Sequence, residues 1–142
     1  MLLIHDLAET KLDDIPKYEK INYPDYDKKE NETMLSIFLK GTYGAVDSMT
    51  PYLEAWDEWY LRNNENARIA KDIDTIQAIY QFLDYNEKYP EKFDENRRIN
   101  WLKEIQCIQT KIGKDLLQKL IIDNKKFVTI RQHYIDYFTV QL

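Results

Sequence analysis

Apolar residues recur along most of the chain at the three- and four-residue spacing of amphipathic α-helices. Gly41 and Gly44 end one expected helix, Pro51 opens the next, and Gly113 separates two later ones. The expected helices cover residues 2–12, 27–39, 51–61, 65–85, 95–110, 114–122 and a segment that begins at 129. Glycine (3) and proline (4) are too scarce for closely spaced hairpin turns. The pattern therefore predicts an all-α fold, a helical bundle of about six to seven helices.

The segment 65–85 carries apolar residues on two sides. One stripe alternates steps of four and three residues, and it consists of Ile69, Ile73, Ile76, Tyr80 and Leu83. Ala67, Ala70 and Ala78 lie on another side. A helix that is apolar on both sides belongs in the middle of a bundle. Asp72 and Asp74 also lie in this segment, and a buried carboxylate there needs a partner such as a cation or a metal.

Length and charge limit the classes of protein that fit. The 142 residues are expected to form a single domain with its own core. The net charge is −5 and no basic block stands out, which disfavours nucleic-acid binding. Cys107 is the only cysteine, so an intrachain disulfide or a cysteine zinc site is excluded. We expect neither a signal peptide nor a membrane segment, and therefore a cytoplasmic protein.

An aromatic stripe marks the expected helix over 51–61. Tyr52, Trp56, Trp59 and Tyr60 follow helical spacing. Such a stripe is typical of a core or of a dimer face, because buried aromatic side chains mostly serve packing.

Near the start of the chain, His5, Asp6 and Glu9 fall on one arc of the expected first helix. One interpretation is a solvated polar face. The other is a metal site, because a neutral imidazole and a carboxylate suit a divalent transition metal. Glu9, one turn on, would be placed to hold or deprotonate a metal-bound water.

Several segments in order resemble the HD-domain phosphohydrolases, and most closely their 5′-deoxynucleotidase-like branch. "HDLAETKLDDIP" resembles that branch's His-Asp-x-x-Glu-x-x-x-Gly-Asp-Ile segment, and the acidic "KKENETM" follows. "ARIAKDIDTIQAI" resembles its later Ala-Lys-x-x-Asp-x-x-Gln helix, and "NRRINWLKEI" and "TKIGKDLLQKL" resemble its C-terminal part. Two motifs in the expected order and distance make the match more specific than the His-Asp pair alone. The resemblance covers residues 1–123, which leaves 124–142 as a C-terminal extension.

The resemblance implies a role for five residues. His5, Asp6 and Asp74 correspond to ligands of a divalent metal ion, which could be Mn, Co, Ni, Mg or Zn. Glu9 corresponds to the catalytic acid/base and Asp14 to an acidic residue of the substrate pocket. At two positions the sequence and the family pattern disagree. Asp13 stands where the pattern has Gly, and helical periodicity favours Asp72 over Asp74 as the buried carboxylate.

Members of this branch carry a further metal-binding His and a phosphate-binding Arg on a helix upstream of the His-Asp pair. The chain begins too late for both, so we expect an HD domain without its first helix or helices, or a misassigned start. His133, the only other histidine, matches no motif and is expected to be a surface or packing residue.

Two functional hypotheses follow. The first, which the resemblance implies, is a metal-dependent phosphohydrolase that acts on (deoxy)nucleoside 5′-monophosphates and releases phosphate. The resemblance also suggests a homodimer. The alternative is a catalytically inactive helical interaction module. It would pair through the Trp56/Trp59 face or through the apolar stripe Met1–Leu7.

Overall fold

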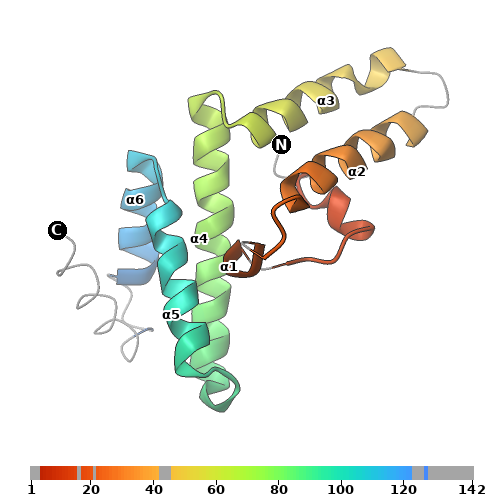
Figure 1. Cartoon of the computed structure of the whole chain (residues 1–142). Coiled ribbons are helices and arrows are strands. Elements are labelled where there is room, and N and C mark those ends of the chain that lie inside the picture. Colours follow the sequence, from red (N-terminus) through yellow and green to blue (C-terminus); the bar gives the residue numbers. More distant parts are fainter. Residues whose placement is uncertain (1–3, 16, 21, 42–45, 123–126, 128–142) are drawn as a thin grey trace. The chain divides into compact units, whose positions relative to one another are not determined.

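The computed structural model describes residues 4–15, 17–20, 22–41, 46–122 and 127. All regular elements within these residues are helical, which confirms the all-α class (Figure 1). The α-helices are α1 (Lys17–Lys20), α2 (Tyr26–Gly41), α3 (Val46–Leu61), α4 (Glu65–Lys88), α5 (Glu95–Lys103) and α6 (Lys111–Leu117). Because α1 is a single turn, the number of longer helices in this part of the chain is slightly below the expected six to seven. The helix expected from residue 129 lies outside the described residues.

The chain divides into two compact units, Met1–Ala70 and Lys71–Leu142, and the boundary falls within α4. The single-domain organisation stays a prediction. No helix in the described ranges is both long and apolar enough to cross a membrane.

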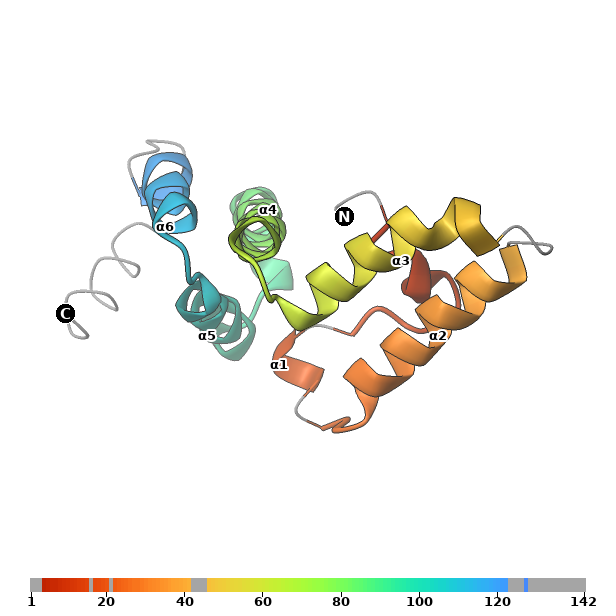
Figure 2. The same ribbon diagram turned by 90° about the horizontal axis from the view of Figure 1, so that it is seen from above.

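In the first unit, α2 packs against α3 and against the 3-10 helix η1 (Leu7–Thr10) (Figure 2). Its core consists of Ala8, Met34, Phe38, Trp56 and Trp59. The indole N–H of Trp56 donates to Asn31 Oδ1 at 2.7 Å, so the buried ring keeps a hydrogen-bond partner. Trp56 is 1% and Trp59 7% exposed. The core interpretation of this stripe is therefore confirmed, and the suggestion that a Trp56/Trp59 face serves as a pairing surface is wrong.

The helix expected over residues 2–12 is wrong for the described part of that segment. The backbone N–H groups of Leu7, Glu9 and Lys11 donate to the carbonyls three residues earlier, which is the 3-10 pattern. Asp6 precedes η1 without a side-chain capping bond. A short segment without a cap cannot offset the cost of nucleating an α-helix, and packing of Ala8 and Leu7 against the core sets its shape instead.

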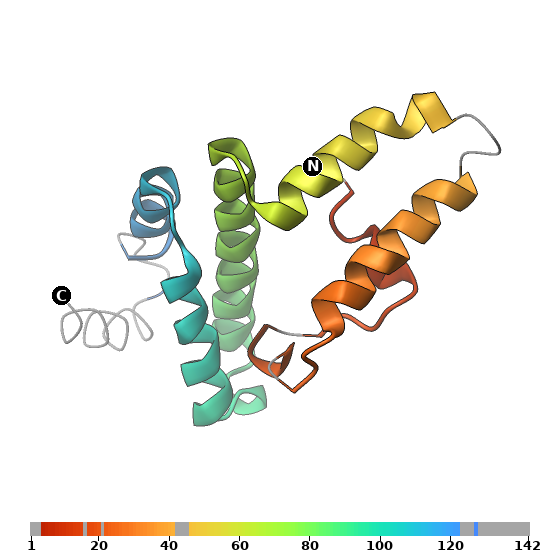
Figure 3. The same cartoon turned by 45° about the horizontal axis from the view of Figure 1, so that its top comes forward.

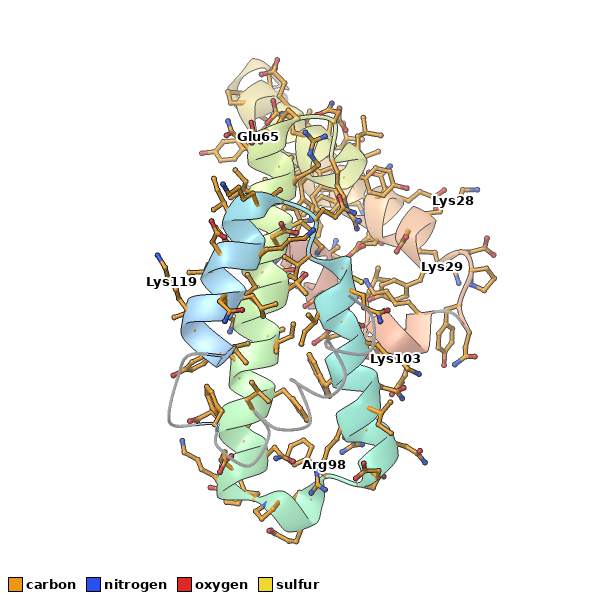
Figure 4. All side chains as sticks on the ribbon, turned by 90° about the vertical axis from the view of Figure 1, so that its left-hand side faces the viewer. Lys28, Lys29, Glu65, Arg98, Lys103 and Lys119 are labelled. Carbon is orange, nitrogen blue, oxygen red and sulfur yellow. The ribbon has the colours of Figure 1, made fainter. Side chains whose placement is uncertain are left out.

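In the second unit, α5 and α6 lie alongside α4 (Figure 3). The core residues are Ile76, Ile79, Phe82, Leu83, Ile105, Ile108, Leu117, Ile121 and Phe127. Arg98 closes the turn between α4 and α5, because it donates to Asn86 Oδ1 at 2.9 Å and to the Pro90 carbonyl at 2.8 Å (Figure 4). The expected stripe on α4 is only partly correct: Ile76 and Leu83 are buried, whereas Ile73 is 37% exposed.

The region around Gly113 also differs from expectation. The segment expected as one helix over 95–110 ends as α5 at Lys103 and continues as the 3-10 helix η3 (Glu104–Cys107). Gly113 does not separate helices but lies inside α6, which passes into a π-helical turn, η4 (Gln118–Ile122). A Cβ atom on Gly113 would lie 2.9 Å from Cγ of Asp72. Glycine is thus required there because α4 approaches the first turn of α6 too closely for a side chain.

Candidate functional site

His5 and Asp6 lie together immediately before and at the start of η1. The Nε2 atom of His5 is 2.9 Å from Oδ1 of Asp6. The imidazole also packs against the indole of Trp59, with 4.8 Å between ring centroids and 54° between ring planes. The His5 side chain is 15% exposed and that of Asp6 62%, so the pair has one sheltered and one open member. Nitrogen and carboxylate donors this close are the types that a divalent transition metal binds.

Glu9 lies in η1, on the same segment, and its acidity is strongly perturbed. The pKa of Glu9 is raised from its ordinary 4.5 to about 7, first by burial and then by the charges of Asp14, Asp6 and Glu30. Lys20 acts in the opposite direction. A carboxyl group with a pKa near 7 exchanges its proton near neutral pH, which is what general acid/base chemistry requires.

Lys20 lies close to Tyr26 and Glu30 in the first unit. The ammonium of Lys20 lies 3.9 Å from Glu30 Oε2 and 4.5 Å from the centroid of the Tyr26 ring. The Tyr26 ring is buried, and its hydroxyl donates to the backbone carbonyl of Asp13. Sequence reasoning missed Lys20, Tyr26 and Glu30, because no motif or local spacing connects them to Glu9. The nearest signal was the acidic stretch Lys28–Met34, which contains Glu30.

The two aspartates of α4 have different environments. Asp72 is 3% exposed, as periodicity favoured, but its partners are not a cation. Its carboxylate accepts from the backbone N–H of Gln109 at 3.0 Å, and from the backbone N–H and hydroxyl of Thr110 at 2.7 and 2.6 Å. Asp72 therefore fastens the start of α6 to α4, and its hydrogen bonds give it a structural function.

Asp74, in contrast, is partly exposed. Its side chain is 22% exposed, and Oδ2 lies 3.0 Å from the ammonium of Lys71 one turn earlier on α4. The Asp74 carboxylate is therefore partly hydrated and forms an ion pair within its own helix. Its assignment as a metal ligand stays a prediction, as do those of His5 and Asp6.

His5 and Asp6 are donors of the types that bind a divalent metal, but two residues do not make up a complete ligand set. The imidazole Nε2 and the carboxylate Oδ1 are 2.9 Å apart. In the part of the chain that the structure describes, no three His, Cys, Asp or Glu side chains gather into a metal-binding group. His5 and Asp6 are in contact in the first unit, Glu9 follows on the same segment, and Asp74 belongs to the second unit. His133 lies outside the described residues.

The chain is similar to a known protein family and to several curated proteins. A family model described as an HD domain matches residues 1–114. The 5′-deoxynucleotidase hdd1 of Schizosaccharomyces pombe is 24% identical over 132 residues, which cover 92% of this chain and 65% of that protein. The 5′-deoxynucleotidase YGK1 of Saccharomyces cerevisiae is 27% identical over 128 residues, which cover 88% of this chain and 57% of that protein.

A vertebrate relative matches a shorter stretch. The 5′-deoxynucleotidase HDDC2 of Danio rerio is 25% identical over 89 residues, which cover 61% of this chain and 42% of that protein. The chain therefore spans between 42% and 65% of the length of these three curated relatives. No solved structure matches it.

Proposed function

The chain belongs to the HD-domain family, and we propose that it is a metal-dependent phosphohydrolase that releases phosphate from (deoxy)nucleoside 5′-monophosphates. The names of the relatives support this substrate class, since each is a 5′-deoxynucleotidase. The single observation that carries the proposal is the His5–Asp6 pair, with 2.9 Å between Nε2 and Oδ1 and with Glu9 one helical turn later in η1. The raised pKa of Glu9 supports it.

We assign the roles residue by residue. His5, Asp6 and Asp74 would hold a divalent cation, which could be Mn, Co, Ni, Mg or Zn. Such a cation would supply polarisation of the phosphoryl group and a lowered pKa for a water molecule. Glu9 holds and passes on a proton at its carboxyl group, because a pKa of about 7 leaves both protonation states populated at neutral pH. Asp14 contacts the substrate.

The first test separates metal binding from helix integrity. The purified chain is offered Mn²⁺, Co²⁺ or Ni²⁺, and bound metal and phosphate release from deoxynucleoside monophosphates are measured. The variant is Asp74→Ala, and its matched control is Asp84→Ala. Asp84 also lies on α4 and pairs with a lysine, Lys88, at 2.7 Å, and it is 20% exposed.

Asp74→Ala should lose about a hundredfold or more in metal affinity, because even outer partners of metal ligands contribute about 10–100-fold. Asp84→Ala should bind metal like the original chain. Equal losses in both variants, or none in either, would contradict the assignment of Asp74.

A second variant separates ligand from acid/base. Glu9→Gln preserves shape but cannot hold a negative charge, so it should retain bound metal while phosphate release falls by about 10²-fold or more. Loss of the metal in Glu9→Gln would make Glu9 a ligand instead.

We also propose a homodimer, which the family resemblance suggests, and a cytoplasmic location. Sedimentation equilibrium is the direct test of the dimer, and a single monomeric species across the concentration range would contradict it. Subcellular fractionation tests the location.

A further inference from the structure

We propose that Tyr26 is a positioning residue that fixes Asp14 beside Glu9 by donating its hydroxyl hydrogen bond to the Asp13 carbonyl. The proposal rests on the proposed function, because the substrate-binding role of Asp14 comes from it. The role of Tyr26 itself comes from its contacts.

Tyr26 is well held. It is the first residue of α2, its backbone N–H donates to the Tyr23 carbonyl at 2.9 Å, and its side chain is 7% exposed. The ammonium of Lys20 lies 4.5 Å from its ring centroid. The hydroxyl therefore projects from a fixed ring, and a bond from it can restrain a less ordered partner.

The partner is a loop that lacks regular structure. Residues 13–15 follow η1 without forming a helix, and the side chains of Asp13 and Asp14 are exposed. The pattern of the family places a glycine at position 13, where a left-handed turn would be possible without strain. Asp13 does not use that conformation, because Arg62 is the only non-glycine residue with a positive φ in the described ranges. The bond from Tyr26, thirteen residues away, supplies a tertiary restraint at this position.

The charges around the hydroxyl place it among the acidic residues of the site. The pKa of Tyr26 is raised, first by burial and then by Glu30, Glu9, Asp14 and Asp13. The phenol therefore stays protonated and remains a donor near neutral pH. Asp14 also acts on Glu9, for which it is the largest charge that raises the pKa. Release of the loop would thus weaken the substrate contact of Asp14, whereas Glu9 is held in η1 and keeps burial as the largest cause of its raised pKa.

The test is Tyr26→Phe, which keeps the ring and removes only the hydroxyl, with Tyr23→Phe as control. Tyr23 is 53% exposed, and its bond to Tyr26 uses a backbone carbonyl that phenylalanine retains. Tyr26→Phe should raise the KM for a deoxynucleoside monophosphate about three- to tenfold, the range of one hydrogen bond, with kcat within about twofold. It should also lower the backbone order parameter of Asp14. Tyr23→Phe should change neither.

The outcomes separate the two proposals. If the original chain releases no phosphate from any nucleotide, the proposed function fails, and the order parameter of Asp14 alone decides the role of Tyr26. An Asp14 order parameter that is unchanged in Tyr26→Phe overturns the positioning role whether or not the chain is active. A fall in kcat as large as the rise in KM, together with a lowered unfolding midpoint, also overturns the positioning role, since it indicates general damage to the core.

Discussion

Replacing Asp72 with alanine removes a buried carboxylate from three hydrogen bonds and leaves two backbone N–H groups and a hydroxyl without their acceptor. A hydrogen bond to a charged group contributes about 1.5–3 kcal/mol, and bonds that share one acceptor are not additive. We therefore expect Asp72→Ala to lower the free energy of unfolding by about 3–5 kcal/mol. This is a large part of the roughly 5–15 kcal/mol that stabilises a typical domain.

The matched comparison is Asp74→Ala, two residues away on α4. Asp74 is partly exposed and pairs with Lys71 at 3.0 Å within the same helix, an ion pair worth about 0–1 kcal/mol. The two variants should thus differ by at least about 2 kcal/mol in stability, although Asp74 is the one assigned to metal binding.

Urea unfolding, followed by far-UV circular dichroism without added metal, measures both variants against the original chain. If Asp72→Ala does not fold, Asp72→Asn keeps one acceptor oxygen and should lose about 1.5–3 kcal/mol. The reasoning is refuted if Asp74→Ala destabilises as much as Asp72→Ala, or if Asp72→Ala costs less than about 1 kcal/mol.

Two further predictions concern stability. Gly113→Ala should lower the free energy of unfolding by about 1–3 kcal/mol, because the new Cβ would be forced against the buried carboxylate of Asp72. The control Gly41→Ala has open space around its Cβ, so it should be neutral or stabilise the fold by up to about 1 kcal/mol. Equal urea midpoints in the two variants would contradict this prediction. Glu9 has a folded pKa of about 7 and an ordinary value of 4.5, so the folded state binds the extra proton between these values and stability should fall as pH rises from about 4.5 to 7. Urea midpoints at several pH values should show Glu9→Gln losing this dependence and the exposed control Glu19→Gln keeping it; a slope that persists in Glu9→Gln would assign it to another group.

The sequence by itself determined the helical class and most helix positions. Helical spacing and scarce glycine predicted α2, α3 and α4 over 27–39, 51–61 and 65–85, and the observed bounds agree at most ends within a few residues. These features depend on neighbours three and four positions apart, so the local sequence is enough to predict them. Motif order predicted the family in the same way, because it needs only residue identity and distance along the chain.

The same local reasoning failed where partners are distant in sequence. Periodicity identified Asp72 as the buried carboxylate but not its partner, because Thr110 follows 38 positions later. The sequence predicts a break between helices at Gly113, because nothing in its neighbours along the chain shows that α4 approaches it. In place of the helix expected over residues 2–12, the described residues form the 3-10 helix η1, and its shape follows from the packing of Leu7 and Ala8.

For the candidate site, the sequence supplied the residues and the tertiary structure supplied their chemistry. His5, Asp6 and Glu9 were identified from one short motif. Only folding buried Glu9 and surrounded it with the charges of Asp14, Asp6 and Glu30, which together raise its pKa to about 7. A protonation equilibrium depends on solvent exclusion and on every nearby charge. Neither is set by the identity of the residue or by its immediate neighbours in the chain.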